Sequence, residues 1–377
     1  MTAFGTSDSR LLRSPLADDH LARGVTLAAY HGAEVPLHFG DARSEHEAVR
    51  SAVGLFDFSF RSKFILTGEH RVRFLHRIVS NDVKSLSVGQ GTYATLLSAQ
   101  GRILVDLRIY VEEDRLWVDT DADLAEKAIS GLKRYIIGDR VGVEPSQLYS
   151  IALQGPQSRK TVHELLGGNL PPLEREMDHG AVDYEGGRTH VVRLSSTGEE
   201  GYEIWLEADR LQRFWRAALD AGRVSACGSE ALESLRIEAG IPRYGQDLAE
   251  DTLPLEAGLL NALSFNKGCY VGQEIVERAR SRGHVNWKLM GLRLELGAQV
   301  PKPSEVLTAE GKTVGEVTSA CFSPSLNRPV ALAYLRREVS EPGTKLAFAT
   351  GSLAEVVQLP FVSRGGSLSA GLARCGY

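Results

Sequence analysis

The sequence has few cysteines and no long apolar run. Its 377 residues include four cysteines, which are widely spaced and form no CxxC pair: Cys227, Cys269, Cys321 and Cys375. This spacing argues against a disulfide scaffold and a preformed structural zinc site, and it favours reduced thiols in the cytoplasm. No segment approaches the roughly 18 apolar residues that a membrane-spanning helix needs, so we expect no membrane partner.

A strong charge of one sign is absent as well. The formal net charge is −5, and nothing indicates the basic surface that nucleic-acid binding requires. The first residues lack the apolar core of a secretory leader, and their acidic residues argue against a transit peptide. Metal-binding HExxH pairs, a P-loop and a Gly-x-Ser-x-Gly elbow are also missing. We therefore expect a cytoplasmic protein without a metal or nucleic-acid partner.

The remaining composition is that of a globular protein, with 43% hydrophobic and 24% charged residues. Helical and strand periodicities alternate from residue 23 to 284, which predicts an α+β region of two lobes. One lobe covers about 55–150, and the other covers 23–54 plus 151–284. Residues 1–22 are predicted to be a loose tail, and short β-rich runs from 285 to 377 predict an all-β barrel.

The segment Ile103 to Val111 is a predicted strand with a polar face. Because side chains alternate along a strand, Asp106, Arg108 and Tyr110 share one side. One interpretation is a solvated sheet face with an Asp106–Arg108 ion pair. The other is a pocket wall on which Asp106 holds or transfers a proton.

A second candidate is Glu203, which follows an acidic turn bracketed by Gly198 and Gly201. A carboxylate held on a strand can accept two parallel hydrogen bonds from an N–C–N edge, such as that of a pterin or guanine. The alternative is a plain hairpin entry with exposed acids.

A third candidate is Cys269, within the stretch Lys267 to Glu274 (KGCYVGQE). A helix is predicted to start near Gly272. A cysteine near a helix N-terminus and beside a lysine can have a lowered pKa and act as a nucleophile or metal ligand. The alternative is a small buried thiol that fills a turn.

Read in order, these pieces resemble the aminomethyltransferase (T-protein) superfamily of glycine cleavage over roughly residues 20–365. The resemblance rests on collinear segments: 45–57 (EHEAVRSAVGLFD), 81–83, 101–110, 153–156, 244–247, 254–259 and 315–319. It implies three lobes around a central cavity that receives tetrahydrofolate.

The resemblance also assigns roles to individual residues. Asp106 matches the aspartate that contacts the reacting folate nitrogens, and Glu203 matches the pterin-binding glutamate. Four further positions are implied to bind the cofactor: Tyr93, Tyr110, Arg236 and Tyr244.

Some positions depart from the T-protein pattern. Ser196 stands where a Tyr is usual, Leu232 where an Arg is usual, and Ser59 to Ser62 replaces Ser-His-Met-Gly. These losses weaken the case for transfer from an aminomethyl-lipoyl carrier. The KGCYVGQE stretch instead resembles YgfZ-type proteins, which use folate and support assembly or repair of iron–sulfur enzymes.

The sequence therefore predicts a tetrahydrofolate-binding accessory protein with iron–sulfur proteins as partners. In that reading Cys269 is the functional thiol and Asp106 a second reactive group. The alternatives are a tetrahydrofolate-dependent aminomethyltransferase and a non-catalytic scaffold that has lost folate.

Overall fold

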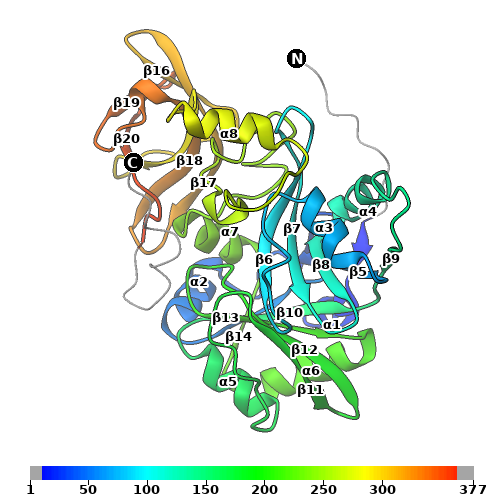
Figure 1. Cartoon of the computed structure of the whole chain (residues 1–377). Coiled ribbons are helices and arrows are strands. Elements are labelled where there is room, and N and C mark those ends of the chain that lie inside the picture. Colours follow the sequence, from blue (N-terminus) through cyan, green and yellow to red (C-terminus); the bar gives the residue numbers. More distant parts are fainter. Residues whose placement is uncertain (1–10, 363–377) are drawn as a thin grey trace.

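The structure is a computed structural model that describes residues 11–362. Cys375 and the last part of the predicted barrel segment lie outside the described residues. Two antiparallel-rich sheets form the centre, and a closed barrel lies at one end of the molecule (Figure 1). The predicted α+β fold with a C-terminal β-barrel is confirmed.

The first sheet has the strand order β6-β7-β8-β5-β9 and is antiparallel throughout. Its strands are β5 (Arg61–Thr67), β6 (Gly91–Leu97), β7 (Ile103–Val111), β8 (Leu116–Asp121) and β9 (Gly142–Pro145). Alternate residues such as Phe64 and Leu107 pack against α3 (Arg71–Ile78) and α4 (Ala125–Lys133), which bury Phe74 and Leu132. The other face of this sheet is therefore turned away from these helices.

The second sheet has the order β11-β12-β13-β10-β4-β14. Its strands are β4 (Gly54–Asp57), β10 (Tyr149–Gln154), β11 (His179–Tyr184), β12 (Gly187–Arg193), β13 (Gly201–Leu206) and β14 (Ser225–Cys227). Helices α5 (Ser158–Leu165) and α6 (Ala208–Asp220) contribute buried residues to the core of this sheet. Strand β4 thus belongs here, although the sequence placed it at the start of the first lobe. Tyr110, Trp117 and Trp205 pack between the two sheets.

The N-terminal residues form a small sheet, β1-β3-β2, with one helix. These elements are β1 (Leu12–Arg13), α1 (Ala17–Ala22), β2 (Leu27–Tyr30) and β3 (Ala33–Pro36). The prediction of a loose tail is therefore wrong for residues 11–22. Leu16 is fully buried, and Ser14 Oγ donates a 2.5 Å hydrogen bond to Asp57 of β4. No local pattern indicates this packing, because Ser14 and Asp57 lie 43 residues apart in the chain.

The C-terminal barrel closes in the order β15-β18-β17-β16-β19-β20. Its strands are β15 (Trp287–Leu294), β16 (Val306–Ala309), β17 (Lys312–Ser323), β18 (Arg328–Arg336), β19 (Lys345–Phe348) and β20 (Leu353–Val357). Helices α2 (Ala42–Ser51), α7 (Ser229–Glu238) and α8 (Gln273–Ser281) complete the fold, and α7 contacts β17 and β18 (Figure 1). None of the helices within residues 11–362 has both the length and the apolar composition needed to cross a membrane.

Candidate active site

Charged residues occupy alternate positions on three neighbouring strands of the first sheet. Asp119 of β8 lies opposite Arg108 on one side and Lys63 on the other, and Asp121 lies opposite Arg61. Because alternate residues of a strand share a face, these three strands place six acidic or basic side chains on one face of the sheet. These are Arg61, Lys63, Asp106, Arg108, Asp119 and Asp121. They lie on the face turned away from α3 and α4.

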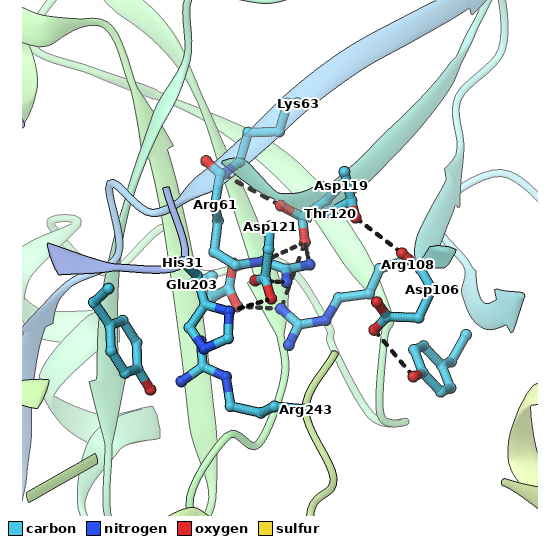
Figure 2. Close-up of polar contacts among 12 residues, drawn as sticks. His31, Arg61, Lys63, Asp106, Arg108, Asp119, Thr120, Asp121, Glu203 and Arg243 are labelled. Carbon is cyan, nitrogen blue, oxygen red and sulfur yellow. Dashed lines mark hydrogen bonds and ion pairs between the residues drawn. The ribbon is translucent and has the colours of Figure 1, made fainter. Parts of the chain in front are cut away.

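Asp119 is the centre of this charged cluster and is completely buried. Arg61 Nη2 lies 2.6 Å from Asp119 Oδ2, and Lys63 Nζ lies 3.4 Å from Oδ1. Arg61 Nη1 also lies 2.5 Å from Asp121 Oδ1 (Figure 2). Burial alone would raise the carboxylate pKa values, but these cations outweigh it, so the pKa values of Asp119 and Asp121 are lowered.

Glu203 brings the second sheet to the cluster. It lies on β13, is fully buried, and its Oε1 accepts a 2.8 Å hydrogen bond from Arg108 Nη1. Its other oxygen, Oε2, is buried without a hydrogen-bond partner among the described residues. The expected Asp106–Arg108 ion pair is therefore replaced by a pair between Arg108 and Glu203. Glu203 is not an exposed acid at a hairpin entry.

Asp106 has a similar arrangement. Tyr93 of β6 donates a 3.0 Å hydrogen bond to Asp106 Oδ2, while Oδ1 is buried without a partner within residues 11–362. Burial raises the pKa of the Asp106 carboxyl, and the charge of Asp121 adds to this effect. Arg61, Arg108 and the Tyr93 hydrogen bond oppose the shift without cancelling it. Asp106 thus binds a proton more readily than an ordinary aspartate.

Two further basic side chains adjoin the cluster. His31 Nδ1 lies 3.3 Å from Asp121 Oδ2. The Arg243 guanidinium stacks 4.1 Å from the Tyr30 ring centroid, and its Nη1 bonds Glu233 Oε1 at 2.9 Å. Burial lowers the pKa of Arg243 to about 9.

His31, Asp121 and Asp123 offer atoms within 4.8 Å of one another, a spacing that could hold a metal ion. Asp121 is already neutralised by Arg61 at 2.5 Å. A second cation would therefore meet a guanidinium, and we interpret the group as an ion-pair network.

Of the residues predicted from the sequence, four gather here. Asp106, Glu203 and Tyr93 are described above. Tyr110 lies two residues beyond Arg108 on β7, with its ring 5.3 Å from that of Trp205. Its hydroxyl is buried without a hydrogen-bond partner in the described part of the chain.

Three predicted residues are engaged elsewhere. Arg236 is buried between α7 and the barrel, where it pairs with Asp247 at 2.6 Å. The Tyr244 hydroxyl accepts a 2.9 Å hydrogen bond from Lys127 Nζ. Cys269 is exposed on the segment before α8. Within residues 11–362, none of these three residues makes a direct hydrogen bond to Asp106 or Glu203.

Lys267, the neighbour that was expected to make the Cys269 thiol reactive, is engaged in hydrogen bonds of its own. Lys267 is buried, and its ammonium donates to the main-chain oxygens of Val79 at 2.6 Å and Asn81 at 2.9 Å, and also to that of His76. These acceptors lie at and beyond the C-terminal end of α3. Lys267 therefore fastens its loop to α3, and its charge is committed to that contact.

Sequence reasoning missed several members of the cluster. Arg61-Ser62-Lys63 and Asp119-Thr120-Asp121 both carry charges two residues apart, and the structure places them on strands β5 and β8. That spacing is the signal that drew attention to Asp106 and Arg108, and it would have found these four residues as well. His31 and Arg243 offered no comparable pattern.

Comparison with known proteins identifies the family of this chain. Residues 16–267 match the GCVT N-terminal domain, and residues 288–363 match the glycine cleavage T-protein C-terminal barrel domain. The chain belongs to the glycine cleavage T-protein family. It is 32% identical to an aminomethyltransferase of Bacillus subtilis over 94% of this chain and 100% of that protein. An aminomethyltransferase of Rubrobacter xylanophilus is 33% identical over 94% and 95%.

A solved structure agrees with this placement. The glycine cleavage system aminomethyltransferase T from Bartonella henselae matches with a TM-score of 0.87 and 28% identity, covering 94% of this chain and 98% of that one. The T-protein family resemblance stated from the sequence is therefore confirmed, and the family supports tetrahydrofolate as the cofactor.

The predicted iron–sulfur accessory role is wrong. Relatives named aminomethyltransferase match nearly the full length of the chain, and they favour the alternative of a glycine-cleavage-type transferase. The iron–sulfur partners lose their support with that role. The YgfZ-type assignment rested on the eight residues of KGCYVGQE, and the similarity to aminomethyltransferases extends over 94% of the chain.

Proposed function

We propose that this protein is a tetrahydrofolate-dependent aminomethyltransferase. The observation that carries the proposal is a pair of carboxylates, Glu203 fully buried and Asp106 partly buried, each with one buried oxygen that has no hydrogen-bond partner among the described residues. Leaving a buried carboxylate oxygen unpaired is costly. These two oxygens therefore suit a ligand that brings its own N–H donors, as the pterin ring of tetrahydrofolate does.

Glu203 is the anchor in this proposal. Arg108 holds its Oε1 at 2.8 Å, which fixes the carboxylate and leaves Oε2 to accept a hydrogen bond from the ligand. The sequence suggested two parallel hydrogen bonds that use both oxygens. Because Oε1 already serves Arg108, we now assign the main ligand contact to Oε2.

Asp106 is the catalytic carboxylate in this proposal. When bound, tetrahydrofolate would supply the nitrogen atoms that accept the one-carbon unit. Tyr93 holds Asp106 Oδ2 at 3.0 Å and leaves Oδ1 for a ligand N–H or for a proton. A fixed negative charge at this point stabilises a cation that develops nearby, and orienting the acceptor saves the entropy of positioning it. Tyr93 and Asp106 thus form one catalytic unit.

The binding proposal is tested by calorimetric titration with tetrahydrofolate. Glu203→Gln keeps the shape of the side chain and removes its charge. A hydrogen bond to a charged group contributes about 1.5–3 kcal/mol, so we expect the Kd to rise by about tenfold or more. Glu207→Gln is the matched control because that acid is exposed just beyond β13. Equal affinity in Glu203→Gln and wild type would remove Glu203 as the anchor, and no binding by wild type would favour the scaffold alternative.

The catalytic proposal needs a second assay. Wild-type protein should form methylene-tetrahydrofolate from an aminomethyl-lipoyl carrier. Asp106→Asn should lower kcat by about 100-fold or more while the Kd for tetrahydrofolate changes by only a few fold, because electrostatic stabilisation of the transition state is lost. Binding without transfer by wild type would contradict the catalytic part alone.

The YgfZ-type assignment stays a prediction from the KGCYVGQE stretch, and the cytoplasmic location stays a prediction from the composition. The exposed Cys269 has no part in the proposed reaction.

A further inference from the structure

Arg61 is linked indirectly to both carboxylates that the proposed reaction uses, through the two acids with which it pairs. Its side chain is 5% exposed and pairs with Asp119 at 2.6 Å and with Asp121 at 2.5 Å. Burial disfavours its charge, but these two partners outweigh burial, so the pKa of Arg61 is raised well above its usual range. Arg61 is therefore a permanent cation inside the protein. One of its ion pairs is with Asp119 and the other is with Asp121.

The first contact leads to Glu203. Asp119 Oδ2, which Arg61 holds, also lies 3.5 Å from Arg108 Nη1. Arg108 in turn donates to Glu203 Oε1 at 2.8 Å. Removing Arg61 would leave Asp119 with Lys63 at 3.4 Å and Arg108 at 3.5 Å as its cationic partners, and it would draw Arg108 towards Asp119. The rotamer of Glu203 thus depends on Arg61 through two intermediates.

The second contact leads to Asp106. Arg108 lies opposite Asp119 in the β7–β8 ladder, and continuing that register by two residues brings Asp106 opposite Asp121. Two carboxylates on one face of neighbouring strands repel each other. Arg61 neutralises Asp121 and so limits that repulsion. In agreement, Asp121 raises the pKa of Asp106 and Arg61 lowers it.

Other groups also face Asp106. Tyr93 donates from β6 at 3.0 Å, and Arg108 lies on the same strand. Thr120 of β8 donates to the main-chain oxygen of Asp106 at 2.9 Å. Tyr244 acts at longer range, since its own pKa is raised partly by the charge of Asp106.

We propose that Arg61 is a positioning residue that couples the two folate-facing carboxylates, with Asp121 as its antagonist at Asp106. Arg61 keeps Glu203 oriented through Asp119 and Arg108, and it keeps Asp106 available in its charged form against the repulsion of Asp121. The use of this coupling in catalysis rests on the proposed function. The coupling itself is a property of the ligand-free protein.

The coupling is measured directly by the carbon-13 NMR titration of the Asp106 carboxyl in selectively labelled protein, with Asp106→Asn to assign the signal. Arg61→Met should raise the pKa of Asp106, and Asp121→Asn should lower it, each by about one unit. Arg115→Met replaces a partly exposed arginine that pairs with Asp114 at the β7–β8 turn, and it should leave the pKa of Asp106 unchanged. Shifts of the same sign in Arg61→Met and Asp121→Asn, or no shift in either, would overturn the proposal.

A functional readout separates positioning from folding. Arg61→Met should raise the Kd for tetrahydrofolate and move the acidic limb of the transfer rate to higher pH, while Asp121→Asn should move that limb to lower pH. Arg61→Lys keeps the charge and should recover most of the wild-type pH profile. If Arg61→Met does not fold, the Asp106 pKa measured in Asp121→Asn alone tests the coupling. A rise or no change in that pKa contradicts the coupling. Opposite NMR shifts in a protein that binds no tetrahydrofolate would uphold the coupling and reject the proposed function.

Discussion

His31 is a single residue at which backbone conformation and charge meet. Its φ is 47°, in the left-handed region, and Gly32 follows with φ 82°. A Cβ at Gly32 would lie 2.5 Å from the main-chain nitrogen of Asp123, so the turn is pressed against the start of the segment after β8. This turn places the His31 ring 3.3 Å from Asp121. Burial lowers the pKa of His31, but Asp121 outweighs it and the net pKa is raised.

The raised pKa predicts a pH-dependent stability. A histidine whose pKa is higher in the folded protein stabilises the fold fully below its unfolded pKa of about 6.5, and that contribution is lost as the pH rises through the folded value. Asn tolerates a positive φ, so His31→Asn should remove the charge without straining the turn. We expect this variant to lose about 1 kcal/mol relative to wild type at pH 6, and progressively less above pH 6.5.

The measurement is urea unfolding of both proteins at several pH values between 6 and 9. The difference between wild type and variant isolates His31 from the other histidines. His163→Asn, on the exposed side of α5, serves as the control and should show no such trend. A constant difference across this range would show that the His31–Asp121 contact does not depend on the histidine charge.

At the scale of elements, the sequence revealed strand β7 and its polar face but not the partners of that face. Period-2 alternation identified Asp106 and Arg108 on one face of β7. The partner of Arg108 is Glu203, which lies 95 residues further along the chain in another sheet. No local pattern contains such a register, because the twist of two sheets and the aromatic contacts between them determine it. The sequence alone therefore could not decide whether this face of β7 is a solvated sheet face or a pocket wall.

The KGCYVGQE loop shows why a motif can mislead about chemistry. Its Lys267 caps the end of α3, and its Gly272 has φ 80° with main-chain atoms of Ser98 and Gly101 too close for a side chain. A Cβ at Gly272 would lie 2.5 Å from the Ser98 oxygen. The lysine and this glycine thus fasten the loop to α3 and to the β6–β7 turn. These structural tasks explain the residues without any iron–sulfur chemistry.

At the scale of the whole molecule, acids that precede the barrel in the chain form hydrogen bonds to it. Asp247 Oδ1 accepts hydrogen bonds from Thr318 at 2.5 Å and Ser319 at 2.7 Å, both on β17. Glu238, at the end of α7, accepts one from Ser323 at 2.5 Å. Arg236 binds both Asp247 and Ser319 and is 3% exposed. This residue, predicted from the resemblance to bind the cofactor, joins α7 to the barrel.

Arg236→Met should therefore destabilise the protein strongly. It leaves Asp247 buried without its cation, and breaking one partner of a buried pair costs about 3–5 kcal/mol. Arg293→Met removes an ion pair of 2.9 Å that is 40% exposed on the barrel, and it should cost less than about 1 kcal/mol. Thermal unfolding of the two variants checks this difference, and hydrogen exchange should locate the weakening at α7 and β17. Equal losses would mean that the buried pair does not hold the barrel.

The order of strands along the chain has a consequence for synthesis. The first sheet is drawn from one continuous stretch, residues 61–145, whereas the second takes its strands from residues 54–57, 149–154, 179–206 and 225–227. A ribosome that has released the first 145 residues has provided every strand of the sheet that carries Asp106. The strand with Glu203 is translated later. Strand β4 is translated early, but its parallel neighbour β14 is translated only at residues 225–227. The two carboxylates therefore come together only after most of the chain has been translated.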